Sequence, residues 1–166
     1  MKKAIILSLA VCMLGLAACG TDKPIAQNPT NDASEEYYTQ TNLSALEYQM
    51  YLANKISVAT GQLNTHMSKV QNVASASCAY EDEIEAIDFS IKTLKDDKRD
   101  MTYVYPPDTY SGTREQALKY WQDSIDKLQE IADTLETGKL STEDAINYST
   151  ELKDLFTSIQ SLNFTV

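Results

Sequence analysis

Residues 118–162 read LKYWQDSIDKLQEIADTLETGKLSTEDAINYSTELKDLFTSIQSL. Apolar side chains recur in this stretch at alternating spacings of three and four residues, which places each run on one face of an α-helix. The first run is Leu118, Trp121, Ile125, Leu128, Ala132 and Leu135, and the second is Ala145, Tyr148, Leu152, Leu155, Ile159 and Leu162. The stretch therefore predicts helices over residues 113–136 and 142–162, folded against each other as an antiparallel hairpin.

Residues that favour helix ends lie at the borders of these two runs. Thr113 with Gln116, and Ser141 with Asp144, have the spacing of N-terminal capping boxes. Gly138 stands where a helix C-terminus needs a residue in the left-handed conformation. We therefore expect the loop between the two helices to be short.

Two more helices are expected upstream, over residues 43–74 and 79–101. Apolar residues follow steps of three, four or seven residues at Leu46, Met50, Ala53, Ile56, Leu63, Met67, Val70 and Ala74, and then at Ile84, Ile87, Ile91, Leu94 and Met101, with an interruption at Lys98. Ser44 and Glu47 fit a capping box for the first of these helices, which has Ser34 as an alternative start.

Together these patterns predict an all-α fold, an up-down antiparallel four-helix bundle. Pro106 and Pro107 interrupt helix formation and form the link to the third helix. Residues 75–77 contain neither Gly nor Pro. An alternative is therefore open, in which the first two helices are continuous and the helical hairpin folds against one long helix.

The charge of the chain limits its partners. The chain has 166 residues and a net charge of −10. Lys2 and Lys3 are the only charged residues before Cys19, which leaves 12 basic and 24 acidic side chains in the remainder. A surface with this excess of acid repels nucleic acid and anionic lipid headgroups, so we expect no nucleic-acid partner.

The N-terminus has the pattern of an export signal. Two lysines precede an apolar run of 15 residues, shorter than the ~20 that a membrane-spanning helix needs. The run ends in Leu16-Ala17-Ala18-Cys19, which resembles the lipobox of bacterial lipoproteins. That resemblance implies a signal peptide over residues 1–18 and a covalent diacylglycerol on Cys19. It covers about the first 20 residues and implies nothing about the domain that follows.

The same resemblance implies a location outside the cytoplasm. The lipid on Cys19 would hold the protein at the outer face of the cell membrane. Because position 20 is not Asp, sorting to the outer membrane is open in a cell with two membranes. Residues 19–33 contain two prolines and read as a flexible tether, followed by the helical domain over residues 34–166. Cys78 is then the one thiol left, and we expect it to be buried.

No catalytic, metal-binding or cofactor motif stands out in the sequence. His66 is the only histidine, and positions 62 and 70 offer it no metal-binding partner on the same helix face. No serine has a recognisable base beside it in a nucleophile motif. We therefore expect His66 to lie at the surface or the boundary of the core, and we expect no enzyme activity.

The segment from Tyr103 to Tyr110 is the most distinctive internal feature. Tyr103, Tyr105 and Tyr110 accompany two prolines there and offer an aromatic ledge for a glycan or another small envelope ligand. The same rings also suit a lid over one end of the bundle, with their hydroxyl groups in water.

The first predicted helix is unusually poor in charge. Between Leu43 and Ser77 the charged residues are Glu47, Lys55 and Lys69, whereas residues 81–100 contain twelve. A neutral polar helix is either packed on several sides or offered to a partner. The leading interpretation is a membrane-anchored lipoprotein whose bundle is an interaction or structural module, with residues 43–74 facing an envelope protein. The alternative is a ligand-binding module that uses the tyrosine segment.

Overall fold

The computed structural model describes residues 40–75 and 80–162 of the chain. Within these ranges four helices follow one another: α1 (Ala45–Ala74), α2 (Tyr80–Tyr103), α3 (Ser111–Glu136) and α4 (Thr142–Gln160). The predicted signal peptide, lipidation site, tether and buried Cys78 all lie outside the described residues.

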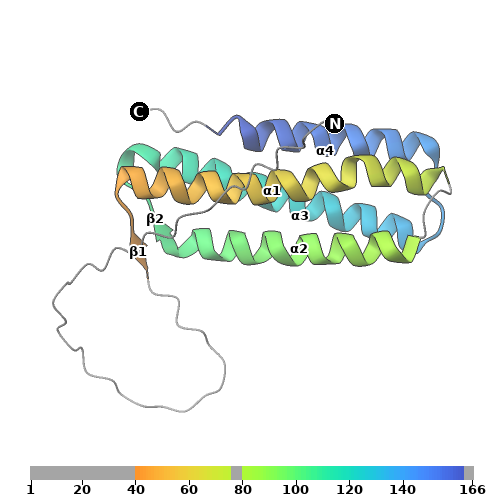
Figure 1. The fold of residues 1–166 in the computed structure, drawn as a ribbon, viewed down its shortest axis with the longest axis horizontal. Coiled ribbons are helices and arrows are strands. Elements are labelled where there is room, and N and C mark those ends of the chain that lie inside the picture. The colour runs from red at the N-terminus through yellow and green to blue at the C-terminus, as the bar shows by residue number, and fades with distance from the viewer. Residues whose placement is uncertain (1–39, 76–79, 163–166) are drawn as a thin grey trace, which may run out of the picture. The chain divides into compact units, whose positions relative to one another are not determined.

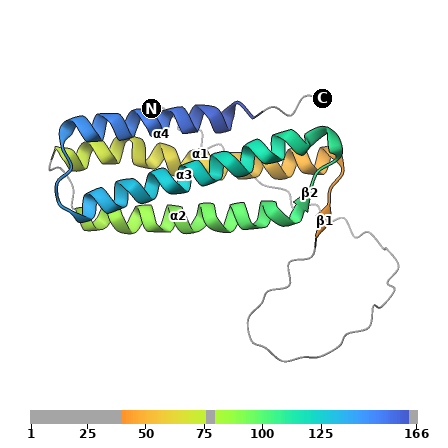
Figure 2. The same cartoon turned by 180° about the vertical axis from the view of Figure 1, so that it is seen from behind.

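The helices pack antiparallel, with α1 alongside α4 and α2 alongside α3 (Figure 1, Figure 2). This arrangement confirms the predicted up-down four-helix bundle. It excludes the long-helix alternative, because α1 ends at Ala74 and α2 runs back along the bundle from Tyr80. None of the helices in the described part of the chain is both long enough and apolar enough to span a membrane.

Three of the predicted helix ends are confirmed. Ser44 and Glu47 form a capping box that starts α1 at Ala45, the later of the two predicted starts. Ser141 and Asp144 form the second capping box, at the start of α4. Gly138 follows α3 with a φ of 66°, the left-handed conformation that glycine adopts without steric cost.

The predicted cap at Thr113 is wrong. The short 3₁₀ helix η1 (Asp108–Tyr110) runs directly into α3, so α3 already begins at Ser111 and has no side-chain cap. Arg114, in the first turn of α3, instead caps the neighbouring helix. Its guanidinium donates hydrogen bonds to three carbonyl oxygens at and just beyond the end of α2, those of Met101, Thr102 and Val104.

A two-residue strand pair lies at the same end of the bundle. The strands β1 (Thr41–Asn42) and β2 (Val104–Tyr105) pair in parallel, with Thr41 opposite Val104. The pairing was not expected from the sequence, and it fixes the entry of the chain into α1 against the link between α2 and α3.

The core follows the predicted faces of α3 and α4. Its largest fully buried side chains include Trp121, Leu128, Leu135, Leu152 and Ile159. The predicted face of α1 is wrong at the N-terminal half of that helix. Leu46 and Met50 are 66% and 67% exposed, while Tyr48 and Leu52 are buried instead. The ring of Tyr48 packs against that of buried Tyr110, with 5.7 Å between the ring centroids, and this contact fixes the rotation of α1.

Burial of Tyr48 makes the bundle sensitive to alkaline pH. Burial raises the pKa of Tyr48 from 10.0 to about 12, against the opposing positive charge of Arg114. The unfolded chain therefore loses this proton at a lower pH than the folded chain does. The contribution of this pKa difference to the free energy of unfolding is fully present below pH 10 and is lost as the pH rises through about 12.

We expect the Tyr48→Phe variant to lose less stability than wild type between pH 10 and pH 12. The difference should be about 1–2 kcal/mol after allowance for solvent screening. Urea unfolding followed by circular dichroism at a series of pH values measures it. Equal losses in the two proteins would contradict the buried environment of this hydroxyl.

Candidate functional site

Polar side chains of α1 and α2 meet across the interface between the two helices. Two groups of residues cross it. One, which we call the Lys55 cluster, consists of Tyr51, Lys55, Asp97 and Asp100. The other, which we call the His66 network, consists of Gln62, His66, Glu83 and Ser90. Both groups pair α1 side chains with side chains of α2.

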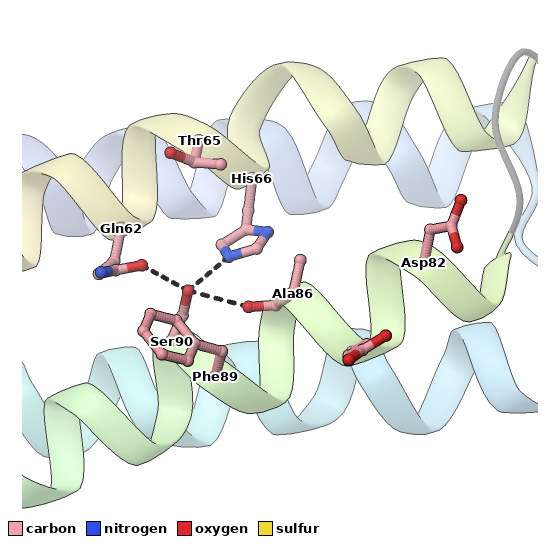
Figure 3. A pocket seen from close by; sticks show the side chains of 8 residues that line it. Gln62, Thr65, His66, Asp82, Ala86, Phe89 and Ser90 are labelled. Carbon is pink, nitrogen blue, oxygen red and sulfur yellow. Dashed lines mark hydrogen bonds between the residues drawn. The ribbon is translucent and has the colours of Figure 1, made fainter.

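The His66 network is buried and tightly connected. The His66 Nδ1 atom lies 2.6 Å from Glu83 Oε1, and its Nε2 atom lies 2.8 Å from Ser90 Oγ. The side chains of His66 and Glu83 are only 1% and 3% exposed. The ammonium group of Lys69 lies 3.5 Å from the second Glu83 oxygen. Figure 3 shows Ser90 with its hydrogen bonds to Gln62, His66 and the Ala86 carbonyl.

Helix geometry brings these residues together. Gln62 and His66 are four residues apart and therefore face the same way from α1. Glu83 and Ser90 are seven residues apart and therefore share a face of α2. Because α1 and α2 run antiparallel, the earlier residue on one helix meets the later residue on the other.

The expectation of a surface or boundary position for His66 is wrong. Its partners lie 17 and 24 residues away on another helix, so their spacing in the sequence does not place them beside His66. The sequence does contain one signal. The helical spacing that places apolar residues on one face of α2 also places Glu83 and Ser90 on that face. A carboxylate and a hydroxyl on a buried face require polar partners.

Counting protons shows how the network is satisfied. The single hydroxyl proton of Ser90 faces three acceptors: Gln62 Oε1 at 2.6 Å, the Ala86 carbonyl at 3.1 Å and His66 Nε2. If Ser90 donates to Gln62 or Ala86, His66 Nε2 donates to Ser90, and the contact with Glu83 needs a further proton. If the Gln62 amide is turned over, Gln62 donates to Ser90 and His66 needs a proton on Nδ1 alone. Both arrangements put a proton between His66 and Glu83.

The carboxylate, imidazole and hydroxyl follow the order of a nucleophilic triad, but Ser90 is poorly placed to attack a substrate. The residue is only 2% exposed and its oxygen is enclosed by three polar partners, so a substrate carbon has little access to it. Ser90 also lies inside α2, where backbone N–H groups are used by the helix and cannot form an oxyanion hole. The geometry suits a non-covalent cross-link, formed by hydrogen bonds, between two helices.

The Lys55 cluster forms a second polar contact across the interface. The Lys55 ammonium group lies 2.7 Å from Asp97 and 2.8 Å from Asp100, and the Tyr51 hydroxyl donates to Asp100. Burial lowers the pKa of Lys55, but the two carboxylates outweigh it and hold the pKa above its usual value. Burial and the Asp100 carboxylate raise the pKa of Tyr51.

The fold buries one of the three tyrosines that were predicted to form a ledge. Tyr110 is 2% exposed, and its hydroxyl accepts a hydrogen bond from Gln49. Tyr105 lies in β2 under the guanidinium of Arg114, and Tyr103 is half-buried at the end of α2. Ligand binding at these tyrosines stays a prediction, although Tyr110 does not share a surface with the other two.

Within residues 40–75 and 80–162, no group of three or more His, Cys, Asp and Glu side chains is arranged to hold a metal ion. Comparison with protein-family models, with curated proteins and with solved structures found no match for this chain.

A double-mutant cycle on His66 and Glu83 tests the cross-link. We expect His66→Leu or Glu83→Leu alone to destabilise the bundle by about 3–5 kcal/mol, because each leaves a buried polar partner unpaired. The double variant should lie within about 1–2 kcal/mol of wild type, because two apolar side chains replace the pair.

Urea unfolding of the four proteins gives the coupling energy. Additive losses in the double variant would contradict the cross-link. Covalent labelling of Ser90 by a serine-directed fluorophosphonate would likewise contradict it, because it would identify an accessible nucleophile.

Proposed function

We propose that the protein is a lipid-anchored lipoprotein of the bacterial envelope, whose helical bundle is a non-catalytic interaction module. The observation that carries the proposal is the lipobox-like sequence Leu16-Ala17-Ala18-Cys19 after a short apolar run. Small residues at positions 17 and 18 suit any signal peptidase, whereas Leu16 and Cys19 suit lipoprotein processing.

Anchoring by lipid fits the charge of the chain. With 12 basic and 24 acidic side chains after Lys3, the protein gains no attraction from an anionic membrane surface. Each buried CH₂ group of an acyl chain contributes about 0.8 kcal/mol, so the two chains of a diacylglycerol hold a protein stably.

The Cys19→Ser variant should accumulate in bacterial cells as an unprocessed precursor without lipid. In wild type, mass spectrometry of the N-terminal peptide should identify a diacylglycerol-modified Cys19 as the first residue. An unmodified peptide that starts at another position would rule out the anchor.

The outward face of α1 supports an interaction role. We call it the α1 outer stripe. Its members all lie within one third of the helix circumference, and all are exposed and uncharged: Leu46, Met50, Ala53, Asn54, Ser57, Gly61, Asn64, Ser68 and Gln71. The exposed positions of α2 are by contrast mostly Asp, Glu, Lys and Arg. An uncharged face loses less hydration free energy when a partner covers it.

Gly61 is the most informative member of this stripe. It lies in the middle of α1, where glycine is less stable than alanine by about 1 kcal/mol. A Cβ atom at this position would meet nothing within 4 Å, so the bundle itself does not require glycine. Ala53, Ser57 and Gly61 are four residues apart and form a low ridge of small side chains. Such a ridge lets the helix of an envelope protein approach closely.

Substitutions at Gly61 separate folding from association. Gly61→Ala should stabilise the isolated protein by about 0.5–1 kcal/mol, because it removes only a helix penalty. Gly61→Glu should stay folded but lose partner recovery in a cross-linked pull-down from solubilised envelopes. The matched control is Asn147→Glu, which adds the same charge at an exposed position of α4.

Sedimentation of the purified protein shows whether the partner is a second copy of the chain. Failure to recover any partner, with a monomer at high concentration, would count against the interaction surface. So would equal losses for Gly61→Glu and Asn147→Glu. Neither result bears on the lipid anchor.

A further inference from the structure

A surface hollow lies beside the His66 network, between α1 and α2 (Figure 3). Its volume is about 420 Å³, within the range of small-molecule sites in proteins. Buried His66 and Ser90 line it together with exposed residues of both helices, Thr65 of α1 and Asp82, Glu85 and Phe89 of α2.

Of the Asp, Glu, Lys and Arg side chains that the structure describes, only acidic ones line the hollow. Asp82 and Glu85 line it, and no Lys or Arg does. Neither carboxylate forms a salt bridge with any residue of the described part of the chain. The nearby ammonium group of Lys69 is directed at buried Glu83 instead. Acidic residues in the first turns of a helix also favour its dipole, so their charge alone does not indicate a ligand.

Phe89 gives an independent indication. Its side chain is 67% exposed, although it belongs to a helix whose other exposed positions are mostly charged. It lies four residues after Glu85 and seven after Asp82, so all three share one side of α2. An aromatic face beside carboxylates is a favourable environment for an ammonium or guanidinium group, which the ring quadrupole and the negative charges both attract.

The base of the hollow is rigid. Ser90 and His66 are held by hydrogen bonds to Gln62, Glu83 and the Ala86 carbonyl, so they do not have to reorganise when a ligand enters. A site that is already ordered loses less entropy on binding than a flexible one.

We propose that this hollow binds a small organic cation, an ammonium or guanidinium group on a short aliphatic stem. In the complex, Asp82 and Glu85 pair with the charge and the ring of Phe89 packs on the stem or the cation. The cation is either a free amine or the side chain of a lysine or arginine in another protein. The hollow lies beside the α1 outer stripe and not on it, so the two proposals are independent.

Titration of the full chain in detergent micelles, followed by ¹⁵N–¹H NMR, tests the proposal. The free probes are 1,5-diaminopentane and agmatine, and the protein-borne probe is a blocked tripeptide with a central lysine. The uncharged control is 1-pentanol. We expect saturable shifts at the amides of Thr65, Glu85 and Phe89 with the cations and none with pentanol. Tighter binding of the free amines would identify the ligand as a free amine, and tighter binding of the tripeptide would identify it as a side chain of another protein.

Variants locate the binding site. The double change Asp82→Asn with Glu85→Gln should weaken binding about five- to tenfold, and Phe89→Leu about threefold. The matched control is Glu115→Gln with Glu136→Gln, which removes the same charge from exposed positions of α3 and should change binding less than about twofold.

Three results would overturn the proposal. One is the absence of saturable shifts with every cation at millimolar concentration. The second is an equal loss of affinity in the α2 and α3 double variants, which would indicate attraction by overall charge. The third is binding that survives in all of the α2 variants.

Discussion

The contact between His66 and Glu83 is the constraint on which the packing of α1 against α2 depends. A buried carboxylate costs several kcal/mol unless a charged or hydrogen-bonding partner reaches it. His66 supplies that partner at 2.6 Å, and Ser90 satisfies the other ring nitrogen. A shift of α1 by one turn would separate all three side chains. The network therefore selects one register of the two helices, whereas an apolar interface tolerates several.

The other features of the bundle are consistent with this register. The Lys55 cluster crosses the same interface nearer the start of α1. The two polar groups together fix the axial register of α1 against α2 and the rotation of each helix about its axis. At that end, Arg114 caps α2 and the β1–β2 pair holds the entry to α1. Among the described residues, the buried side-chain atoms without a hydrogen-bond partner are Asp97 Oδ2 and Trp121 Nε1, and neither belongs to the His66 network.

Much of the fold could be predicted because its signals are local. The apolar faces of α3 and α4, the caps at Ser44 and Ser141 and the turn at Gly138 depend on neighbours within a few residues. The rotation of α1 could not be predicted in the same way. Leu46 with Met50 and Tyr48 with Leu52 both have helical spacing, and the choice depends on Tyr110, which is distant in sequence. The His66 network has the same character, because its partners come from another helix.

His66 is the single histidine of the chain, so the environment of its side chain is directly measurable. Side-chain ¹⁵N–¹H NMR of protein labelled in histidine gives one imidazole spectrum. We expect an Nδ1 proton that exchanges slowly with water and shows nuclear Overhauser contacts to the side chain of Glu83, and ring protons next to Nε2 that show such contacts to Ser90. An imidazole whose nitrogen protons exchange as fast as those of free histidine, without contacts to α2, would contradict it.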